Sequence, residues 1–191
     1  MKIPENQLNI NKTNLTIIQG DITGQNTEAI VNAANSSLMG GGGVDGAIHH
    51  AGGPIILEEC KKIVFVQGPL PTGKAVITSG GNLKAKFVIH TVGPVWKGGN
   101  HAESELLTSA YRESLKLADE NGIKSLSFPS ISTGAYDYPM IEAADIAIYT
   151  VTNYLEDQAV TIDEVVFVLY SQEAFLVFSS ALGKYREVNN I

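Results

Sequence analysis

The sequence predicts an α/β protein, a three-layer α/β/α sandwich around a mixed, mostly parallel central sheet. After Asp21, short apolar runs alternate with stretches whose apolar residues recur every three or four positions, as strands alternate with helices in a parallel sheet. The run Val165 to Tyr170 is apolar throughout, which is typical of a strand buried on both faces. Before this pattern, Leu8 to Asn11 and Leu15 to Gln19 are two short strands, which we expect to form an antiparallel hairpin.

Composition and charge limit the class of protein. The chain has 191 residues, of which 44% are hydrophobic and 17% charged, so we expect one core and a single domain over residues 1–191. A net charge of −7 argues against a nucleic-acid backbone as partner, because that binding depends on clustered Lys and Arg. No segment approaches the ~20 apolar residues of a membrane span. The single cysteine, Cys60, fits a reducing compartment, so we expect a cytoplasmic protein with no membrane partner. A monomer is expected.

Local signals place the other elements in chain order. Apolar runs predict strands, apolar residues at helical spacing predict helices, and small residues or prolines predict the loops between them. Asn100, with Glu103 three residues on, predicts a capping box at the start of the third helix, and Asn121-Gly122 predicts its end. The expected strands are 30–34, 74–78, 87–92 and 126–131, and the expected helices are 44–51, 54–63, one through Leu107 to Ala118, one through Ile141 to Leu155, and one containing Phe175 and Phe178.

The stretch from Ile30 to Gly53 carries the strongest functional signal. It predicts a strand, a loop of four consecutive glycines from Gly40 to Gly43, and a helix that starts at Val44. The unpaired N–H groups at such a helix end favour an anion, and the helix dipole keeps Asp45 in the first turn ionised. This pattern predicts a phosphate cradle with a base beside it. A structural glycine turn, with Asp45 an ordinary helix-start acid, is the alternative.

The same glycines do not predict a conventional Rossmann dinucleotide site. Gly41, Gly43 and Gly46 satisfy G-x-G-x-x-G, but Asn35 to Met39 separate them from the preceding strand. The acid expected about 20 residues further on is also missing. The G-x-G-x-x-G match is therefore not interpreted as a Rossmann dinucleotide site.

Polar residues interrupt or follow the apolar runs. Asn32 lies inside a strand and is assigned a structural role, whereas Asn35 at the strand exit can orient a ribose hydroxyl or a water. His49 lies one helical turn from Asp45, so a relay is conceivable, but a satisfied structural histidine is favoured. His90 is expected to be buried and hydrogen-bonded. No set of His, Cys and acidic residues has metal-ligand spacing, so no metal is expected.

Three further positions lie at strand ends, where ligands collect in open α/β sheets. Asp21 follows the second strand and can accept a hydrogen bond from an exocyclic amine, or can simply cap a short helix. Ser132 to Tyr136 form a second small-residue loop whose amide groups could grip a diphosphate, or an ordinary strand-to-helix loop. Tyr170 ends the last strand and can stack on a base, or pack against the protein.

Together these residues resemble the macrodomain family, and within it the MacroD-type hydrolase branch. Five signatures occur in the family's order and extend over nearly the whole chain, roughly Leu8 to Gly183. Each is weak alone, but five in sequence are specific. They are Gly20-Asp21-Ile22-Thr23, Val31-Asn32-Ala33-Ala34-Asn35, Gly40-Gly41-Gly42-Gly43-Val44-Asp45, Ile89-His90-Thr91-Val92-Gly93-Pro94 and Pro129-Ser130-Ile131-Ser132-Thr133-Gly134.

The resemblance implies a macrodomain fold that binds ADP-ribose, with no cofactor and no metal. Adenine would be held by the Asp21 carboxylate and the Ile22 backbone, with its ring stacked on Tyr170. The terminal ribose would face Asn35 and Asp45, the two residues expected to carry catalysis. The diphosphate would lie between two loops, formed by Gly42, Gly43 and Val44 on one side and by Ser132, Thr133, Gly134, Ala135 and Tyr136 on the other.

The activity implied by this branch is removal of ADP-ribose from acidic side chains of mono-ADP-ribosylated proteins, and deacetylation of O-acetyl-ADP-ribose. Family members that only bind ADP-ribose often lack the acid, so Asp45 predicts an enzyme. A non-catalytic ADP-ribose reader is the alternative, and turnover of a cyclic nucleotide phosphate or another nucleotide sugar is a third hypothesis. Asp45 could hold the attacking water or position the ribose. Cys60 is expected in a helix away from the loops, so covalent catalysis is not expected.

One position departs from the family pattern. The second loop commonly has glycine where this chain has Asp137, between Tyr136 and Tyr138. A carboxylate that pointed inwards would repel a diphosphate. We therefore expect Asp137 to face solvent.

Overall fold

The computed structural model describes residues 6–190, which form a seven-stranded sheet with helices on both faces. The strands are β1 (Gln7–Ile10), β2 (Thr13–Gln19), β3 (Ala29–Ala33), β4 (Ala75–Ser79), β5 (Phe87–Thr91), β6 (Ser125–Phe128) and β7 (Glu164–Leu169). The helices are α1 (Gly43–Gly52), α2 (Pro54–Gln67), α3 (Glu103–Glu120), α4 (Met140–Asp157) and α5 (Gln172–Asn189), with a short 3-10 helix, η1 (Ile22–Gly24). Every predicted element has a counterpart within a few residues. Within residues 6–190, none of the helices combines the length and apolar character that crossing a membrane requires.

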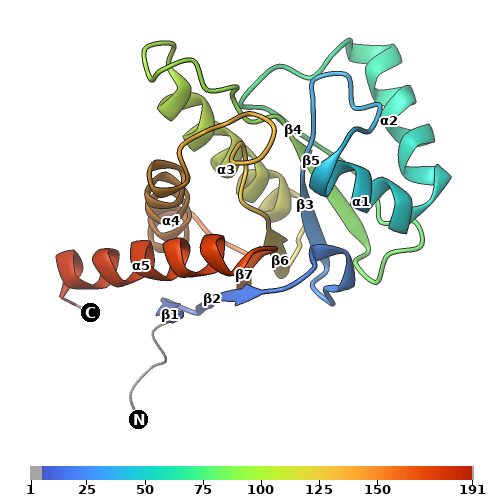
Figure 1. Ribbon diagram of the computed structural model, residues 1–191. Coiled ribbons are helices and arrows are strands. Elements are labelled where there is room, and N and C mark those ends of the chain that lie inside the picture. Colours follow the sequence, from blue (N-terminus) through green and yellow to red (C-terminus); the bar gives the residue numbers. More distant parts are fainter. Residues whose placement is uncertain (1–5, 191) are drawn as a thin grey trace.

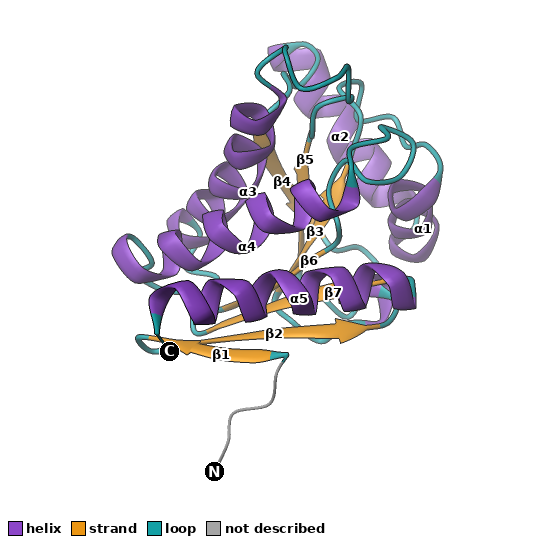
Figure 2. Cartoon of the chain, turned by 60° about the vertical axis from the view of Figure 1, so that its left-hand side comes forward, coloured by secondary structure: helices purple, strands orange, loops and turns teal. Residues whose placement is uncertain are grey.

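The helices divide between the two faces of the sheet, which confirms the predicted three-layer sandwich. In Figures 1 and 2, α1 and α2 lie on one face, and α3, α4 and α5 lie on the other. Side chains of residues 30–34, in β3 and just beyond it, alternate between two buried clusters: Val31 joins the cluster beneath α3 to α5, whereas Ile30 and Ala34 join the cluster beneath α1 and α2. Asn32 therefore projects into the layer beneath α1 and α2.

The strand order is β1-β2-β7-β6-β3-β5-β4. The five central strands β2, β7, β6, β3 and β5 are parallel to one another, and the first hairpin, β1 with β2, is antiparallel as predicted. At the other edge β4 is also antiparallel to β5, which the sequence did not indicate. Because the central strands run the same way, the loops after all five emerge at one edge of the sheet. This edge is where ligands bind in open α/β sheets.

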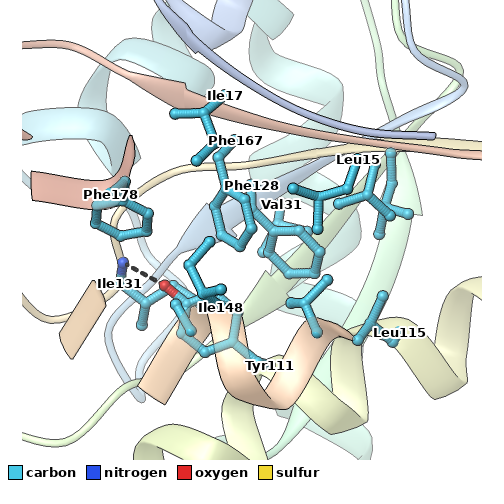
Figure 3. Close-up of a cluster of buried hydrophobic side chains, with 14 of the residues drawn as sticks. Leu15, Ile17, Val31, Tyr111, Leu115, Phe128, Ile131, Ile148, Phe167 and Phe178 are labelled. Atoms are coloured by element: carbon cyan, nitrogen blue, oxygen red, sulfur yellow. Dashed lines mark hydrogen bonds between the residues drawn. The ribbon is translucent and has the colours of Figure 1, made fainter. Parts of the chain in front are cut away.

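An aromatic cluster lies between the sheet and α3 to α5 (Figure 3). The rings of Tyr111 from α3 and Phe128 from β6 are 5.4 Å apart, and those of Phe128 and Phe167 are 5.7 Å apart. The buried Tyr111 hydroxyl accepts a hydrogen bond from the backbone N–H of Ile131 at 3.2 Å. This bond ties the chain just beyond β6 to α3, and so holds the base of the loop that begins at Ser132.

The start of α3 differs from the predicted capping box. The N-cap is Ala102, in the left-handed region at φ 58°, and Asn100 donates to the Gly98 carbonyl at 3.5 Å instead of capping the helix. The Glu103 side chain is 2% exposed and accepts hydrogen bonds from the backbone N–H groups of the loop before it, those of Lys97, Gly99 and His101. A buried carboxylate therefore organises this turn. Its requirement for several donors outweighs the local capping signal.

We expect Glu103→Gln to destabilise the protein in a pH-dependent way. Desolvation disfavours the ionised Glu103 carboxyl, but hydrogen bonds from the backbone of His101, Glu103, Lys97 and Gly99 hold its pKa below the usual range. A lowered pKa stabilises the fold above the unfolded-state pKa of about 4.5, and this stabilisation is lost as pH falls through the folded-state pKa. Urea unfolding of wild type and Glu103→Gln should differ most at pH 7 and converge in acid. A difference that does not depend on pH would contradict this.

Candidate functional site

The predicted site residues lie on loops that leave parallel strands at the same edge of the sheet. Asp21 follows β2, Tyr170 follows β7, the Ser132 loop follows β6, and Asn35 follows β3. These strands are neighbours in the order β2-β7-β6-β3. Three strand spacings of about 4.8 Å place the two ends of this row roughly 14 Å apart. The structure therefore brings together residues that are up to 149 positions apart in the chain.

The glycine loop leads into the exposed start of α1. Gly42 is the N-cap and makes no side-chain cap, while Gly40 and Gly43 have φ angles of +79° and +60°. Gly43 and Val44 lie in the first turn, where N–H groups have no acceptor within the helix. A Cβ on Gly41 would lie 3.1 Å from Asp45 Oδ2, so a side chain there would crowd the carboxylate. The loop thus has the geometry of an anion-binding helix terminus.

Asp45 differs from an ordinary helix-start acid, because it is only 4% exposed. Its Oδ1 accepts a hydrogen bond from Asn32 Nδ2 at 2.7 Å, and His49 Nε2 lies 3.5 Å from the same oxygen. Its other oxygen, Oδ2, is on the side of Gly41. The carboxylate is therefore anchored through one oxygen and presents the other towards the glycine loop.

Asn35 closes the loop in which it lies. Its Nδ2 donates to the Gly40 carbonyl at 2.9 Å, and its Oδ1 accepts from the backbone N–H and the hydroxyl of Ser37. Nδ2 also lies 3.4 Å from the place where Gly41 would carry a Cβ. Asn35 thus shapes the glycine loop beside Asp45, and its predicted role towards the ligand stays a prediction.

His90 is buried and hydrogen-bonded, as predicted. It is fully buried, with Nδ1 3.1 Å from Asn32 Nδ2 and Nε2 2.9 Å from the Thr78 hydroxyl. Burial, and to a smaller extent the nearby His49, lowers the pKa of His90 to about 3. His90 is therefore neutral and connects to Asp45 through Asn32. Structural roles for His90 and Asn32 were predicted from the sequence, but nothing in it indicated that the two side chains meet.

Cys60 lies closer to this cluster than expected. Its Sγ is 3.8 Å from His90 Nε2, and the ligand atoms of His49, Cys60 and His90 all lie within 4.8 Å of one another. Cys60 lies in α2, a helix, as expected, but nothing in the sequence indicated that it meets His90. Burial, with the charges of Asp45 and Glu59, raises the pKa of the Cys60 thiol to about 12, so it is not a nucleophile at neutral pH. The expectation that no metal binds stays a prediction.

The second loop is folded by its own hydrogen bonds and by one to a neighbouring loop. Ser132, 6% exposed and at φ +67°, accepts from Tyr138 N–H, and Gly134 accepts from Asp137 N–H at 2.9 Å. The Tyr136 carbonyl accepts from Trp96 N–H at 2.9 Å. Thr133 and Ala135 lie at the partly or fully exposed tip, with Gly134 between them. The fixed tip has backbone amide groups available to an anion.

Asp137 is exposed, as expected from its departure from the family pattern. Its φ is +53°, in the left-handed region that favours glycine. Aspartate tolerates this region better than most residues do. The loop therefore keeps the conformation that glycine would adopt there, and the carboxylate faces solvent.

Asp137→Gly is expected to raise the melting temperature slightly, because glycine adopts φ +53° without strain. The free energy of unfolding should rise by about 1 kcal/mol or less, since glycine also increases the entropy of the unfolded chain. Affinity for ADP-ribose, the ligand that the family resemblance implies, should stay equal or increase, because a nearby negative charge is removed. Thermal unfolding and calorimetry measure both quantities. A clear loss of stability would contradict the strain argument.

Asp21, Ile22 and Tyr170 form the far end of the row. Asp21 caps η1, because its Oδ1 accepts from the N–H and the hydroxyl of Thr23 at 2.9 and 2.7 Å. The residue is nevertheless exposed, so capping and ligand contact are compatible. Ile22 is buried behind it. Tyr170 is 86% exposed, so the packing alternative for this ring is wrong and its faces are open.

Comparison with known proteins identifies the family. The sequence model of the Macro domain matches residues 31–147, which is more than half of the chain. The chain belongs to the Macro domain family. The predicted resemblance is therefore confirmed.

Two solved structures and one curated relative resemble this macrodomain over most of its length. It is 55% identical over 168 residues to a Salmonella newport protein named O-acetyl-ADP-ribose deacetylase, which covers 88% of this chain and 93% of that protein. The Oceanobacillus iheyensis macrodomain with ADP superposes with a TM-score of 0.90 at 45% identity, over 95% of this chain and 96% of that one. A Trypanosoma brucei macrodomain in complex with ADP-ribose superposes with a TM-score of 0.81 at 36% identity, over 88% of this chain and 69% of that one.

Proposed function

We propose that this macrodomain binds ADP-ribose and hydrolyses esters on its terminal ribose. The first proposed substrate is O-acetyl-ADP-ribose, and the second is the ester between ADP-ribose and an acidic side chain of a mono-ADP-ribosylated protein. In either reaction the oxygen of water bonds to the acyl carbon and the bond from that carbon to the ribose oxygen breaks. One proton of the water goes to the ribose oxygen and the other is released to solvent, which leaves ADP-ribose and a carboxylate.

The row of loops supports ADP-ribose as the ligand. Asp21 and Tyr170 stand at one end, with a carboxylate for the adenine amine and an open ring for its face. The Ser132 loop comes next, after β6, and the start of α1 follows β3 beyond it; the amide groups of both can receive a diphosphate. Asp45 and Asn35 stand at the other end, beside the expected terminal ribose. The order of these groups matches the order adenosine, diphosphate, ribose in the ligand.

One observation carries the proposal of hydrolysis: the carboxylate of Asp45 is buried, anchored through Oδ1 and directed through Oδ2 towards the glycine loop. A carboxylate held in this way can orient a water molecule, or fix the ribose so that a water held by the ligand's phosphate attacks. Both routes require Oδ2 to stay in place. Cys60 offers no covalent route, because its thiol remains protonated.

The relatives give independent support. The Salmonella newport protein named O-acetyl-ADP-ribose deacetylase spans nearly the same length, and the Trypanosoma brucei macrodomain was solved in complex with ADP-ribose. A shared fold alone would not carry function to this chain, because function depends on the site. Here the acid and the glycine loop are both present in the geometry described above.

The test is direct turnover by the purified protein. We expect it to release acetate and ADP-ribose from O-acetyl-ADP-ribose, and ADP-ribose from a protein modified on acidic residues, both followed by chromatography. Calorimetry should show binding of ADP-ribose. Tight binding without release from either substrate would favour the reader function instead. Absence of binding would refute the proposal that ADP-ribose is the ligand. The same assay with a cyclic nucleotide phosphate and another nucleotide sugar tests the third hypothesis.

Further proposals concern partners and location. We propose that mono-ADP-ribosylated proteins are physiological partners, that the protein is monomeric and cytoplasmic, and that it has no nucleic-acid partner. The net charge of −7 supports the last of these. Light scattering of the purified protein measures the oligomeric state.

A further inference from the structure

A chain of buried polar side chains lies behind Asp45, in the apolar layer beneath α1 and α2. We propose that Asn32 is a positioning residue for ester hydrolysis: it holds Asp45 through Oδ1 so that Oδ2 faces the substrate, and His90 in turn orients the Asn32 amide. This inference rests on the proposed function. It concerns residues that lie behind the ligand and do not touch it.

The sheet itself brings these residues together. Asn32 on β3 and His90 on β5 are register partners in neighbouring parallel strands, so their side chains project side by side on the same face. Both are fully buried, and the residues two positions away on each strand, Ile30 and Val88, belong to the apolar cluster of that face. Two polar side chains in an apolar layer are unfavourable unless they are hydrogen-bonded. The hydrogen-bond partners of Asn32 and His90 therefore indicate the role of the two side chains.

The hydrogen bonds have one consistent assignment. Asn32 Nδ2 carries two hydrogens, and it lies 2.7 Å from Asp45 Oδ1 and 3.1 Å from His90 Nδ1. An amide oxygen in that place would face a carboxylate, so the amide nitrogen must point there. His90 Nδ1 then accepts, and the imidazole proton sits on Nε2, where the Thr78 hydroxyl lies 2.9 Å away. The neutral imidazole thus fixes the amide, and the amide fixes the carboxylate.

The oxygen of the Asn32 amide indicates that this arrangement carries a free-energy penalty. Asn32 Oδ1 is buried and has no hydrogen-bond partner among residues 6–190. An unsatisfied carbonyl oxygen destabilises a core, and an apolar side chain of similar size would avoid the penalty. A residue that breaks a packing rule in this way is expected at functional sites. The bond from Nδ2 to Asp45 is the compensating gain.

The consequence for the reaction follows from the position of Asp45. Its carboxylate has one firm hydrogen bond, from Asn32, while His49 Nε2 lies at 3.5 Å and is itself without a hydrogen-bond partner among the described residues. Without the Asn32 amide the carboxylate can rotate, and Oδ2 leaves the side of Gly41. A small displacement of a reacting group lowers the rate strongly, whereas contacts with the adenine and diphosphate are unaffected.

The first test replaces Asn32 with leucine, which keeps the volume but removes the amide donor. We expect kcat for O-acetyl-ADP-ribose to fall about 100-fold. The Kd for ADP-ribose should stay within about twofold, because binding energy from the distant groups is unchanged. The matched control is Thr27→Val, which removes two buried hydrogen bonds just before β3, at the end of the strand away from the loops. Its kcat should stay at the wild-type value. An unchanged kcat in Asn32→Leu, or an equal loss in Thr27→Val, would overturn the proposal.

The second test asks whether His90 acts through the amide. His90→Gln keeps a side-chain oxygen that can accept from Asn32 Nδ2, whereas His90→Leu does not. We expect His90→Gln to retain roughly tenfold more kcat than His90→Leu, an effect of the size of one hydrogen bond. Equal losses in the two variants would show that His90 contributes only packing, and would remove it from the proposal.

The third test needs no turnover, so it separates this inference from the proposed function. Nitrogen NMR of wild-type histidines should show His90 protonated on Nε2 and unprotonated on Nδ1 at neutral pH. A crystal structure of Asn32→Leu should show Asp45 Oδ2 moved away from Gly41. The opposite tautomer, a metal ion on His90 Nε2, or an unmoved Asp45 would overturn the inference. Lack of ester hydrolysis by the wild type would refute the proposed function alone.

Discussion

Asp45→Ala is expected to lower kcat/KM for O-acetyl-ADP-ribose by between about 100-fold and 10,000-fold, the range for loss of a group that moves or positions a proton. The reason lies in the geometry of its two oxygens. Oδ1 is held by Asn32, and Oδ2 is directed at the glycine loop, so the substitution removes the carboxylate that faces this loop. Affinity for ADP-ribose should change much less than kcat, because the adenine and diphosphate contacts come from other loops. Steady-state kinetics and calorimetry measure the two effects.

Asp145→Ala is the matched control for that variant. Asp145 is on α4, half exposed, and its carboxylate is 3.4 Å from Lys184 Nζ, so its loss removes one acid and one surface ion pair. Surface pairs of this kind contribute little to stability. Wild-type kinetics are expected. If Asp45→Ala kept more than a tenth of the wild-type kcat/KM, the hydrolytic role of Asp45 would be refuted, and the ligand-binding role would stand alone.

Gly46→Ala is expected to reduce ADP-ribose affinity at least about tenfold, since a displaced backbone loses several hydrogen bonds to an anion. Gly46 lies in α1, and a Cβ there would come within 2.5 Å of the Gly41 carbonyl oxygen. Backbone cannot yield as a flexible side chain does, so the glycine loop must move away from α1. The displacement would reach Asp45 as well, because Gly41 lies against its Oδ2. Calorimetry with ADP-ribose measures the loss.

Gly183→Ala separates this steric effect from helix propensity. Gly183 is inside α5, and a Cβ there would meet nothing within 4 Å. Alanine should therefore stabilise α5 by about 1 kcal/mol, the usual difference between glycine and alanine inside a helix. If Gly46→Ala behaved in the same way, with higher stability and unchanged affinity, the close approach between α1 and the glycine loop would be refuted.

The sequence predicted the fold well, because its strands and helices are marked by local patterns. The apolar run at Val165 and the helical spacing after Ile141 depend only on neighbouring residues. The direction of β4 could not be predicted in this way, since it depends on pairing with β5 and not on composition. The capping box at Asn100 was wrong because the buried Glu103 carboxylate takes its donors from the loop before α3.

The residues expected to face the ligand could also be predicted from the sequence, whereas the contacts of the buried residues behind Asp45 could not. Glycines, an acid and small-residue loops are local signals, so Asp45 and the Ser132 loop could be named in advance. Asn32 and His90 are 58 positions apart and meet only through the register of β3 with β5. Each looked like an isolated polar interruption of a strand. The spacing of His49 from Asp45 was visible, but its approach to Oδ1 depends on the side-chain conformation.

The environment of Cys60 has a consequence for oxidative conditions. Oxidation by peroxide proceeds through the thiolate, and susceptibility follows thiolate character and exposure. Cys60 is fully buried on the inner face of α2 and is the sole cysteine of the chain. Peroxide therefore finds almost no reactive thiolate in the folded protein, and two copies cannot be linked by a disulfide without opening the layer between α2 and the sheet. The enzyme should keep its activity during oxidative stress that inactivates hydrolases with an exposed catalytic cysteine.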